Sequence, residues 1–492
     1  MDRFPERRVE PGDLDPQLAT ALDWRRLNAV PLRTGNGGRA VAVADPSDVL
    51  AVDAIRRALG YDVEIYRAPA PDIMLALETS GLLSGDVVED DLQARSVAEE
   101  LANRASEAPV VNLVNLILRE GLSSGASDIH IEAAEDGARV MNRVDGVKLP
   151  VMRISRTDHL MVISRIKVLA SMDLAERRLP QDGRIRVRDQ SGDVVDIRVN
   201  TVPSTYGECA CLRILRRQAQ VASMEALGMR PEDLRRVQAA LSSSWGMILA
   251  AGPTGCGKST TLSLFLRQVA SPERETLTIE DPVEYQIPHA HQVQVNEKAG
   301  LTFATALRSF VRHDPDIIMV GEIRDRETAE IATRAAMTGH LVFSTVHTND
   351  APTAPVRLID MGVEPFLVAS SLTLVVAQRL VRKVCPDCST QVALPKELAN
   401  ALPLEAPAAQ MQGAGCDRCR GTGYRGRTAI FEVMRVTPKI RSLITARADA
   451  SEIAQAARQD GTRTLLEDGL RLVRNGVTTV QEVLRVTRLE EP

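Results

Sequence analysis

MILAAGPTGCGKS (residues 247–259) joins a short apolar run to a glycine-rich loop. The apolar run predicts a buried strand, and the residues after the loop predict a helix. In a G-x4-G-K-S loop between a strand and a helix, the glycines let main-chain N–H groups surround phosphate at the helix amino end. Lys258 supplies a charge to the outer phosphates, and Ser259 supplies a hydroxyl to Mg²⁺. The predicted nucleotide site comprises Gly252, Pro253, Thr254, Gly255, Cys256, Gly257, Lys258, Ser259 and Thr260.

Three more short apolar runs follow, separated by helical stretches. They are Leu277–Ile279, Ile317–Val320 and Leu341–Thr345. Strands of a parallel sheet are buried on both faces and read as continuous apolar runs. From about residue 228 onward, the sequence therefore predicts an α/β fold with a parallel-rich sheet.

Hydrolysis of a nucleotide also requires an oriented water and charge compensation. One acidic cluster, which includes Glu280 and Glu284, follows a predicted strand, and a second one, with Glu322 and Asp325, follows another. Each cluster alone can be a surface acidic turn, but their shared position at strand carboxyl ends favours metal and water handling. His347 ends a further strand and is a candidate sensor of the γ-phosphate, although a lone histidine is more often structural.

Composition excludes several classes of protein. At roughly 150 residues per domain, 492 residues predict about three domains. A net charge of −5 and an aromatic fraction of 3% argue against direct nucleic-acid binding. The amino terminus, MDRFPERRVEPGD, has no apolar core typical of a signal peptide, and the uncharged stretch at residues 365–378 is too short to span a bilayer. We expect a soluble cytoplasmic protein.

The seven cysteines do not resemble a secreted disulfide framework. Cys385 and Cys388 form one CxxC pair, and Cys416 and Cys419 form another. Two such pairs suit tetrahedral ligation of a structural Zn²⁺, with a redox or iron–sulfur site as the alternative. Cys256 lies in the phosphate loop, where a helix amino end favours thiolate, so we predict that it is alkylatable and shielded by ATP.

The chain divides into segments of different character. Only the part after residue 108 carries motifs, while an acidic stretch without apolar periodicity predicts a linker before it. The predicted segments are a small α/β docking domain at 1–84, a linker at 85–107, an α+β domain at 108–222, and an ATPase domain at 223–492 that includes a zinc module at 383–422.

Arginines gather on one face of the predicted sheet in the 108–222 domain. Asp145-Gly146 predicts a tight hairpin between Arg139–Val144 and Val147–Ile154. Further along, Arg184 and Arg198 lie on strands in which polar and apolar residues alternate. This face is either a solvated surface or a binding surface.

The whole set of motifs resembles the secretion-ATPase superfamily, most closely the GspE-type motors of type II secretion and next the PilB-type pilus assembly ATPases. The resemblance covers nearly everything after residue 108. It rests on the phosphate loop together with ASDIHIE (126–132), RVDG (143–146), RLPQDGR (178–184), the Asp box TIEDPVE (278–284), the Walker B region (316–325), the His box TGHLVFSTVH (338–347) and QRLVR (378–382).

The resemblance implies a RecA-like ATPase core preceded by a PAS-like domain, with ATP, Mg²⁺ and Zn²⁺ as cofactors. Glu284 aligns with the general base that acts on the attacking water, and Glu322 with the glutamate that supports Mg²⁺ and water. The positions of Arg184, Arg198 and Arg213 resemble those of family arginines that reach ATP.

The resemblance also implies partners. Such motors are homo-hexamers in which a neighbouring subunit closes each site. The residue 1–84 domain resembles one that docks on an inner-membrane GspL-type protein, and a GspF-type platform protein is a second expected partner, so we expect peripheral association with the inner membrane.

We therefore expect a hexameric ATPase that drives pseudopilus assembly and protein export in type II secretion. A type IV pilus assembly ATPase is the alternative, and a DNA-uptake or conjugation motor is a weaker one. A nucleotide-gated scaffold with little turnover is disfavoured because both Glu284 and Glu322 are present.

Overall fold

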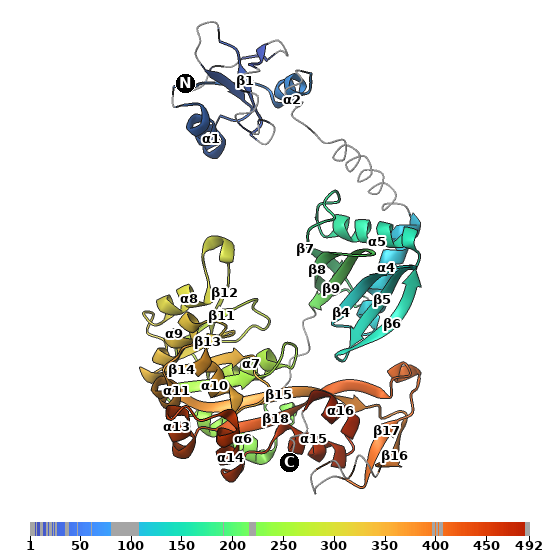
Figure 1. Cartoon of the computed structure of the whole chain (residues 1–492), viewed down its shortest axis with the longest axis vertical. Helices are drawn as coiled ribbons and strands as arrows, with labels where there is room; N and C mark the ends of the chain where they lie inside the picture. The colour runs from blue at the N-terminus through green and yellow to red at the C-terminus, as the bar shows by residue number, and fades with distance from the viewer. Residues whose placement is uncertain are drawn as a thin grey trace. The chain divides into compact units, whose positions relative to one another are not determined.

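The computed structural model describes most of the chain (Figure 1). The described residues are 5–79 except 6, 10–12, 16–17, 19–21, 23, 25–26, 35–38, 47 and 61, and 108–487 except 190, 216–222, 396–398, 400–401 and 403–406. The predicted linker, residues 85–107, lies outside them. The other predicted domain boundaries stay predictions.

The amino-terminal segment contains a three-stranded sheet in the order β1-β2-β3. β1 (Ala29–Leu32) and β2 (Ala40–Val43) are antiparallel, whereas β2 and β3 (Glu64–Arg67) are parallel because helix α1 (Val49–Leu59) connects them. Helix α2 (Ala70–Thr79) follows. The described part of this segment thus combines helices and strands, as the sequence predicted for a small α/β domain.

Six antiparallel strands form a second sheet in the order β6-β5-β4-β9-β8-β7. The strands are β4 (Asp128–Ala134), β5 (Gly137–Val144), β6 (Val147–Ile154), β7 (Gln181–Arg188), β8 (Val194–Ser204) and β9 (Gly207–Leu215), and the helices nearby in sequence are α4 (Ala108–Ser123) and α5 (Arg156–Leu169).

The predicted hairpin in this sheet is confirmed. Asp145 and Gly146 connect β5 to β6, and both have positive φ, 49° and 84°. Two consecutive left-handed residues are what a type I′ turn requires, which explains the Asp-Gly pair.

Seven strands form the largest sheet, and only its last pair is antiparallel. In spatial order they are β12 (His291–Gln294), β11 (Thr276–Glu280), β13 (Ile317–Val320), β14 (Leu341–Val346), β10 (Gly246–Ala251), β15 (Leu372–Val384) and β18 (Tyr424–Arg435). The parallel-rich α/β fold expected from the apolar runs is confirmed.

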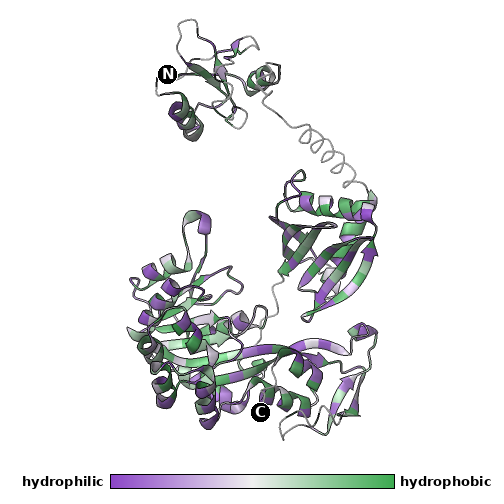
Figure 2. Ribbon diagram, in the orientation of Figure 1, coloured by the Kyte–Doolittle hydropathy of each residue, from purple (hydrophilic) through white to green (hydrophobic). Residues whose placement is uncertain are grey.

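Each face of this sheet is covered by helices, so the central strands are buried on both sides. Along β10, Met247, Leu249 and Ala251 face one apolar core, while Ile248 and Ala250 face the other. Figure 2 shows these strands as largely apolar. The first core contains residues of α8 (Phe303–Phe310), α9 (Arg326–Met337), α10 (Thr353–Asp360), α11 (Pro365–Ser371), α13 (Pro438–Thr445) and α14 (Ala450–Gln459); the second contains residues of α6 (Pro231–Leu241) and α7 (Lys258–Val269).

The carboxyl-terminal part adds a hairpin and two helices. Strands β16 (Ser389–Ala393) and β17 (Ala409–Gly413) are antiparallel, and a short 3-10 turn, Asp417–Cys419, precedes β18. Helices α15 (Leu465–Arg474) and α16 (Val480–Val486) bury their apolar residues against β15 and β18. Among the described residues, no helix is both long and apolar enough to cross a bilayer.

Candidate nucleotide site and tetracysteine centre

The sheet order brings four separate motifs to one edge. β11, β13, β14 and β10 are consecutive neighbours and mutually parallel, so their carboxyl ends lie along the same edge. The Asp box and the Walker B region extend past the ends of β11 and β13, the His box ends with the residue after β14, and the phosphate loop follows β10 directly. In parallel α/β sheets this edge is where ligands bind.

The phosphate loop adopts a conformation that only glycine accepts easily. Gly252, Gly255 and Gly257 have φ of 150°, 77° and 92°, and Gly257 is the N-cap residue of α7. The buried ammonium of Lys258 donates to the carbonyl oxygens of Gly252 (2.7 Å) and Pro253 (3.0 Å). Burial lowers the pKa of Lys258, and its contacts place a positive charge inside the loop.

The prediction of a reactive thiolate at Cys256 is wrong. Its side chain is only 5% exposed, and burial raises the pKa of the thiol despite the nearby Lys258 charge. The sulfur lies against the main chain of the loop, since a Cβ on Gly252 would come within 2.5 Å of it. Helix position favours ionisation, but desolvation prevails here.

Two glutamates of the Asp box have different environments. Glu280 ends β11, is buried, and accepts hydrogen bonds from Thr278 Oγ1 (2.7 Å) and Gln292 Nε2 (2.9 Å). Burial raises the pKa of Glu280. Glu284 is exposed in the loop that follows. Glu280 thus has structural partners, while Glu284 is accessible to a bound water.

The Walker B glutamate and the His-box histidine are in contact. Oε2 of Glu322 lies 3.1 Å from Nε2 of His347, and Oε1 lies 2.5 Å from the guanidinium of Arg324. Burial opposes ionisation of Glu322, but these two hydrogen bonds outweigh it and lower the pKa of the carboxyl. Residues from the ends of β13 and β14 therefore maintain an ionised carboxylate at the sheet edge.

A row of charged side chains crosses the six-stranded sheet at one level. Arg143 on β5, Asp128 on β4, Arg213 on β9 and Arg198 on β8 are successive register partners. Directly opposite residues of an antiparallel sheet share a face, so these side chains lie side by side.

Arg184 lies at the β7 end of this row. Asn200 bonds to Asp182, and Arg186 pairs with Asp196, both at 3.0 Å. Residue 182 thus lies beside residue 200, and residue 186 beside residue 196. In an antiparallel pair with this register Arg184 lies opposite Arg198, so the two arginines are neighbours. The three predicted arginines are therefore brought together on one face, and we call Arg143, Asp128, Arg213, Arg198 and Arg184 the arginine row.

Asp128 is the single acid of the arginine row. Its carboxylate is largely buried and accepts from Arg213 Nε at 3.0 Å and from Ser127 Oγ at 2.8 Å, and Arg143 Nε lies 3.8 Å away. The hydrogen bond to Asp128 raises the pKa of Arg213. It also leaves the two terminal nitrogens of Arg213 available to another anion.

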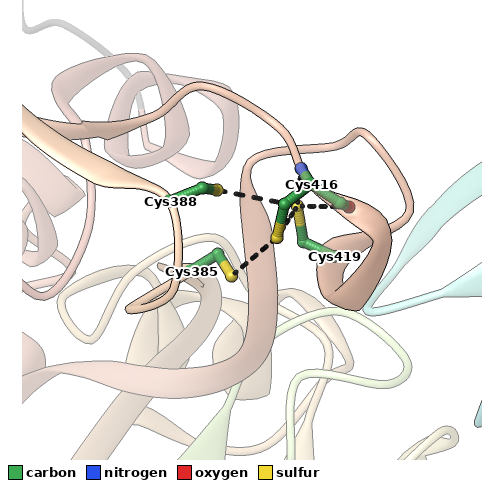
Figure 3. A group of neighbouring side chains, drawn as sticks. All are labelled: Cys385, Cys388, Cys416 and Cys419. Atoms are coloured by element: carbon green, nitrogen blue, oxygen red, sulfur yellow. Dashed lines mark hydrogen bonds between the residues drawn. The ribbon is translucent and has the colours of Figure 1, made fainter.

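The four cysteines of the two CxxC pairs converge (Figure 3). Cys385 follows β15 directly, and its sulfur lies 4.0 Å from that of Cys416; Cys388 and Cys419 are 3.8 Å apart, and all four sulfurs lie within 4.8 Å of one another. A tetrahedral centre with Zn–S bonds of about 2.3 Å has sulfur–sulfur distances of about 3.8 Å. The donor set and its spacing fit Zn²⁺.

Main-chain donors prepare one of these cysteines for ligation. N–H groups of Cys416 (3.1 Å) and Gly423 (3.3 Å) donate to the sulfur of Cys419. Burial opposes ionisation, but these bonds prevail and lower the pKa of Cys419 to about 6. Thiolate is the form that binds metal.

Sequence reasoning missed Asp128 and Arg324. Asp128 pairs with Arg213, which is distant in the sequence, and the spacing of two between Glu322 and Arg324 gave no indication of their contact. The alternation of Asp128, His130 and Glu132 along one strand is the signal that could have placed Asp128 on the arginine face.

Fold and site together define the class of protein. The phosphate loop lies between β10 and α7, and carboxylates lie at the ends of the neighbouring parallel strands. This is the arrangement of a P-loop ATPase. Residues 103–485 match the family described as Type II/IV secretion system protein, and residues 6–81 match the MshEN domain. The chain belongs to the Type II/IV secretion system protein family and is a secretion ATPase.

Individual relatives support this assignment. The chain is 43% identical to Type II secretion system protein E of Pseudomonas aeruginosa, covering 90% of this chain and 88% of that protein. It is 42% identical to the Type IV pilus assembly ATPase PilB of Thermus thermophilus over 98% of this chain, but it spans only 56% of that relative's length. The solved ATPase DotB of Legionella pneumophila shares the fold, with a TM-score of 0.55, 22% identity, and coverage of 76% of this chain and 95% of that one.

Proposed function

We propose that this chain is the cytoplasmic motor that drives pseudopilus assembly, and thereby protein export, in a type II secretion system. The observation that carries the ATPase part is the alignment of four motifs at the carboxyl edge of β11, β13, β14 and β10. The choice of type II secretion is supported by the 43% identity to a Type II secretion system protein E whose length is 88% covered.

Within the site, each residue has a proposed role. The main-chain N–H groups of residues 254–260 and the ammonium of Lys258 bind the phosphates, and Glu284 accepts the proton of the attacking water. Glu322, with its lowered pKa, orients that water through hydrogen bonding, and His347 contacts the γ-phosphate from the end of β14.

Magnesium would be held by the hydroxyl of Ser259, at the first turn of α7, with support from Glu322. When bound, it supplies charge neutralisation on the phosphates. Zinc would be held by the four cysteines, which supply all four ligands of a tetrahedral centre, so its role would be structural.

The arginine row is proposed to complete the site of a neighbouring copy in a homo-hexamer. It presents four cationic side chains and a single carboxylate on one face, as the recognition of a polyanionic phosphate chain requires. The residue 1–84 domain is proposed to dock on a GspL-type inner-membrane protein, with a GspF-type platform protein as the second partner.

Replacement of Asp128 by asparagine tests the arginine row. The amide keeps the volume of the side chain but loses the negative charge that orients Arg213. The same charge offsets the repulsion between Arg213 and Arg198, which lie directly opposite each other on β9 and β8. Loss of a charge-assisted hydrogen bond predicts a decrease of about 10- to 100-fold in kcat/KM for ATP. Asp136→Asn is the matched control, because Asp136 is exposed. Among the described ion pairs it has one partner, Arg153, whose side chain is 77% exposed and lies 3.8 Å away. Equal rates in the two variants would contradict the role of Asp128.

The hexameric ATPase is tested by the hydrolysis rate per subunit across a wide range of protein concentration. Sites completed between subunits predict a rate that rises with concentration in parallel with the mass measured by native mass spectrometry. A constant rate from a monomer would show a self-contained site and reject the hexamer.

A type IV pilus assembly ATPase is the second candidate function, favoured by the 42% identity to PilB of Thermus thermophilus. Deletion of the gene in its host separates the two functions. Loss of enzymes from the culture medium with intact surface pili supports the type II system, whereas loss of pili with intact export supports the pilus motor.

A further inference from the structure

Two side chains of β15, Gln378 and Arg379, pack directly against the phosphate loop. Gln378 is 2% exposed and Arg379 is 7% exposed, and they lie opposite Phe431 and Ile430 on β18. Both residues belong to the motif QRLVR (378–382), to which the sequence assigned no role. Their contacts instead lead to the nucleotide site.

The amide of Gln378 joins the loop to the first turn of α7. Its Nε2 donates to the main-chain oxygen of Cys256 at 2.8 Å, and its Oε1 accepts from Thr261 Oγ1 at 2.7 Å. In a trans peptide the C=O and N–H groups point in opposite directions. Because the Cys256 carbonyl is held toward β15, the N–H of Gly257 is directed away from β15.

Close contact with β15 explains two of the loop glycines. A Cβ at Gly257 would lie 2.7 Å from Nε2 of Gln378, and a Cβ at Gly252 would lie 2.8 Å from the main-chain oxygen of Gln378. Real Cβ atoms essentially never approach another heavy atom this closely, so a side chain at either position would force the loop or Gln378 to shift. The loop therefore rests directly on Gln378, and a change in that side chain acts on the loop main chain.

Arg379 extends the connection to the His box. One terminal nitrogen donates to the main-chain oxygen of Gln378 at 2.8 Å, and the other donates to the main-chain oxygen of Asn349. Asn349 lies in the turn that begins with His347. One buried guanidinium thus bridges Gln378 and the segment that carries His347.

We propose that Gln378 and Arg379 are positioning residues of the nucleotide site: Gln378 orients the loop N–H groups toward the phosphates, and Arg379 holds the His347 turn at a fixed place relative to the loop. The proposal rests on the phosphate-binding role proposed for the loop. Loss of Gln378 contacts weakens ADP and ATP binding alike, because both nucleotides use the loop. Loss of Arg379 contacts weakens ATP binding more, because only ATP has the γ-phosphate that faces His347.

The test measures the dissociation constants of ADP and of a non-hydrolysable ATP analogue by titration calorimetry on the full chain, with kcat, KM and the unfolding midpoint alongside. Gln378→Met keeps the volume but removes both hydrogen bonds, and we expect both dissociation constants to rise about tenfold. Gln378→Glu keeps an acceptor for Thr261 but places a second oxygen against the Cys256 carbonyl, so the loss is expected to be at least as large. Arg379→Met is expected to raise the dissociation constant of the analogue several-fold more than that of ADP.

Controls separate positioning from general loss of stability. Thr333→Val removes a buried hydroxyl that donates to Ala329 within α9, and it is expected to lower the unfolding midpoint without changing nucleotide affinity. Thr261→Val, which removes one of the two anchors of Gln378, keeps the proposal testable if the Gln378 variants fail to fold.

Wild-type affinities in Gln378→Met and Thr261→Val, with binding lost in Lys258→Ala, would overturn the proposal while the nucleotide site stands. Unchanged binding in Lys258→Ala would reject the nucleotide site itself, and this inference with it.

Discussion

Glu284→Gln is expected to lower kcat for ATP hydrolysis by about 10²- to 10⁴-fold while KM and nucleotide affinity stay near wild type. The amide has the same shape but cannot accept a proton from water. Glu284 is exposed and follows the buried end of β11, so its replacement should leave the fold intact. Steady-state hydrolysis and titration of a non-hydrolysable ATP analogue measure the two effects.

Two further variants make this result specific. Glu273→Gln is the matched control, because Glu273 is an exposed carboxylate in the turn before β11 begins. Glu280→Gln tests the competing assignment, since Glu280 ends the same strand but is buried and hydrogen-bonded to Thr278 and Gln292. A large loss of kcat in Glu280→Gln, with none in Glu284→Gln, would move the general base to Glu280. Turnover that is close to zero in the wild type and unchanged in both variants would favour the scaffold function.

Cys385→Ser is expected to abolish stoichiometric zinc binding and to unfold the segment between Cys385 and Cys419 without loss of ATP binding. Structural zinc contributes about 10–16 kcal/mol of apparent binding free energy in small modules, so loss of one of four ligands removes most of the stabilisation. Metal analysis of the purified protein and limited proteolysis followed by mass spectrometry measure the two effects.

Nucleotide affinity is expected to survive because β15 is held independently of the metal. β15 pairs with β10 up to Ala377 and with β18 up to Val384, directly before Cys385. Cys209→Ser is the matched control, since Cys209 is a half-buried free thiol on β9. Full zinc content in Cys385→Ser would refute the ligand assignment, and loss of ATP binding would show that the metal stabilises the ATPase core.

The elements that sequence predicted well are those with strong local signals. The phosphate loop, the Asp-Gly hairpin and the strands Ile317–Val320 and Leu341–Val346 are defined by short-range patterns of glycine and apolar residues. β15 and β18 were not predicted, because six consecutive residues of each strand are buried and include the polar side chains Gln378, Arg379 and Glu432, so neither strand alternates or reads as a continuous apolar run.

The predictions for Cys256, Glu280 and Glu284 were limited by contacts that form only in the folded chain. Cys256 sits where a helix amino end would favour thiolate, but its burial against Gly252 reverses the expected ionisation. The different environments of Glu280 and Glu284 likewise depend on Gln292, which comes from the neighbouring strand β12.

Local patterns were sufficient for the class of protein, the phosphate loop, the two CxxC pairs and the alternation of arginines, because each is specified by residues adjacent in the chain. The order β11-β13-β14-β10, the contact of Glu322 with His347, the arginine row and the contact of Gln378 with the phosphate loop arise only when the strands pair. Strand order and cross-strand register join residues that are tens to hundreds of positions apart, and no local periodicity encodes which strand will lie beside which.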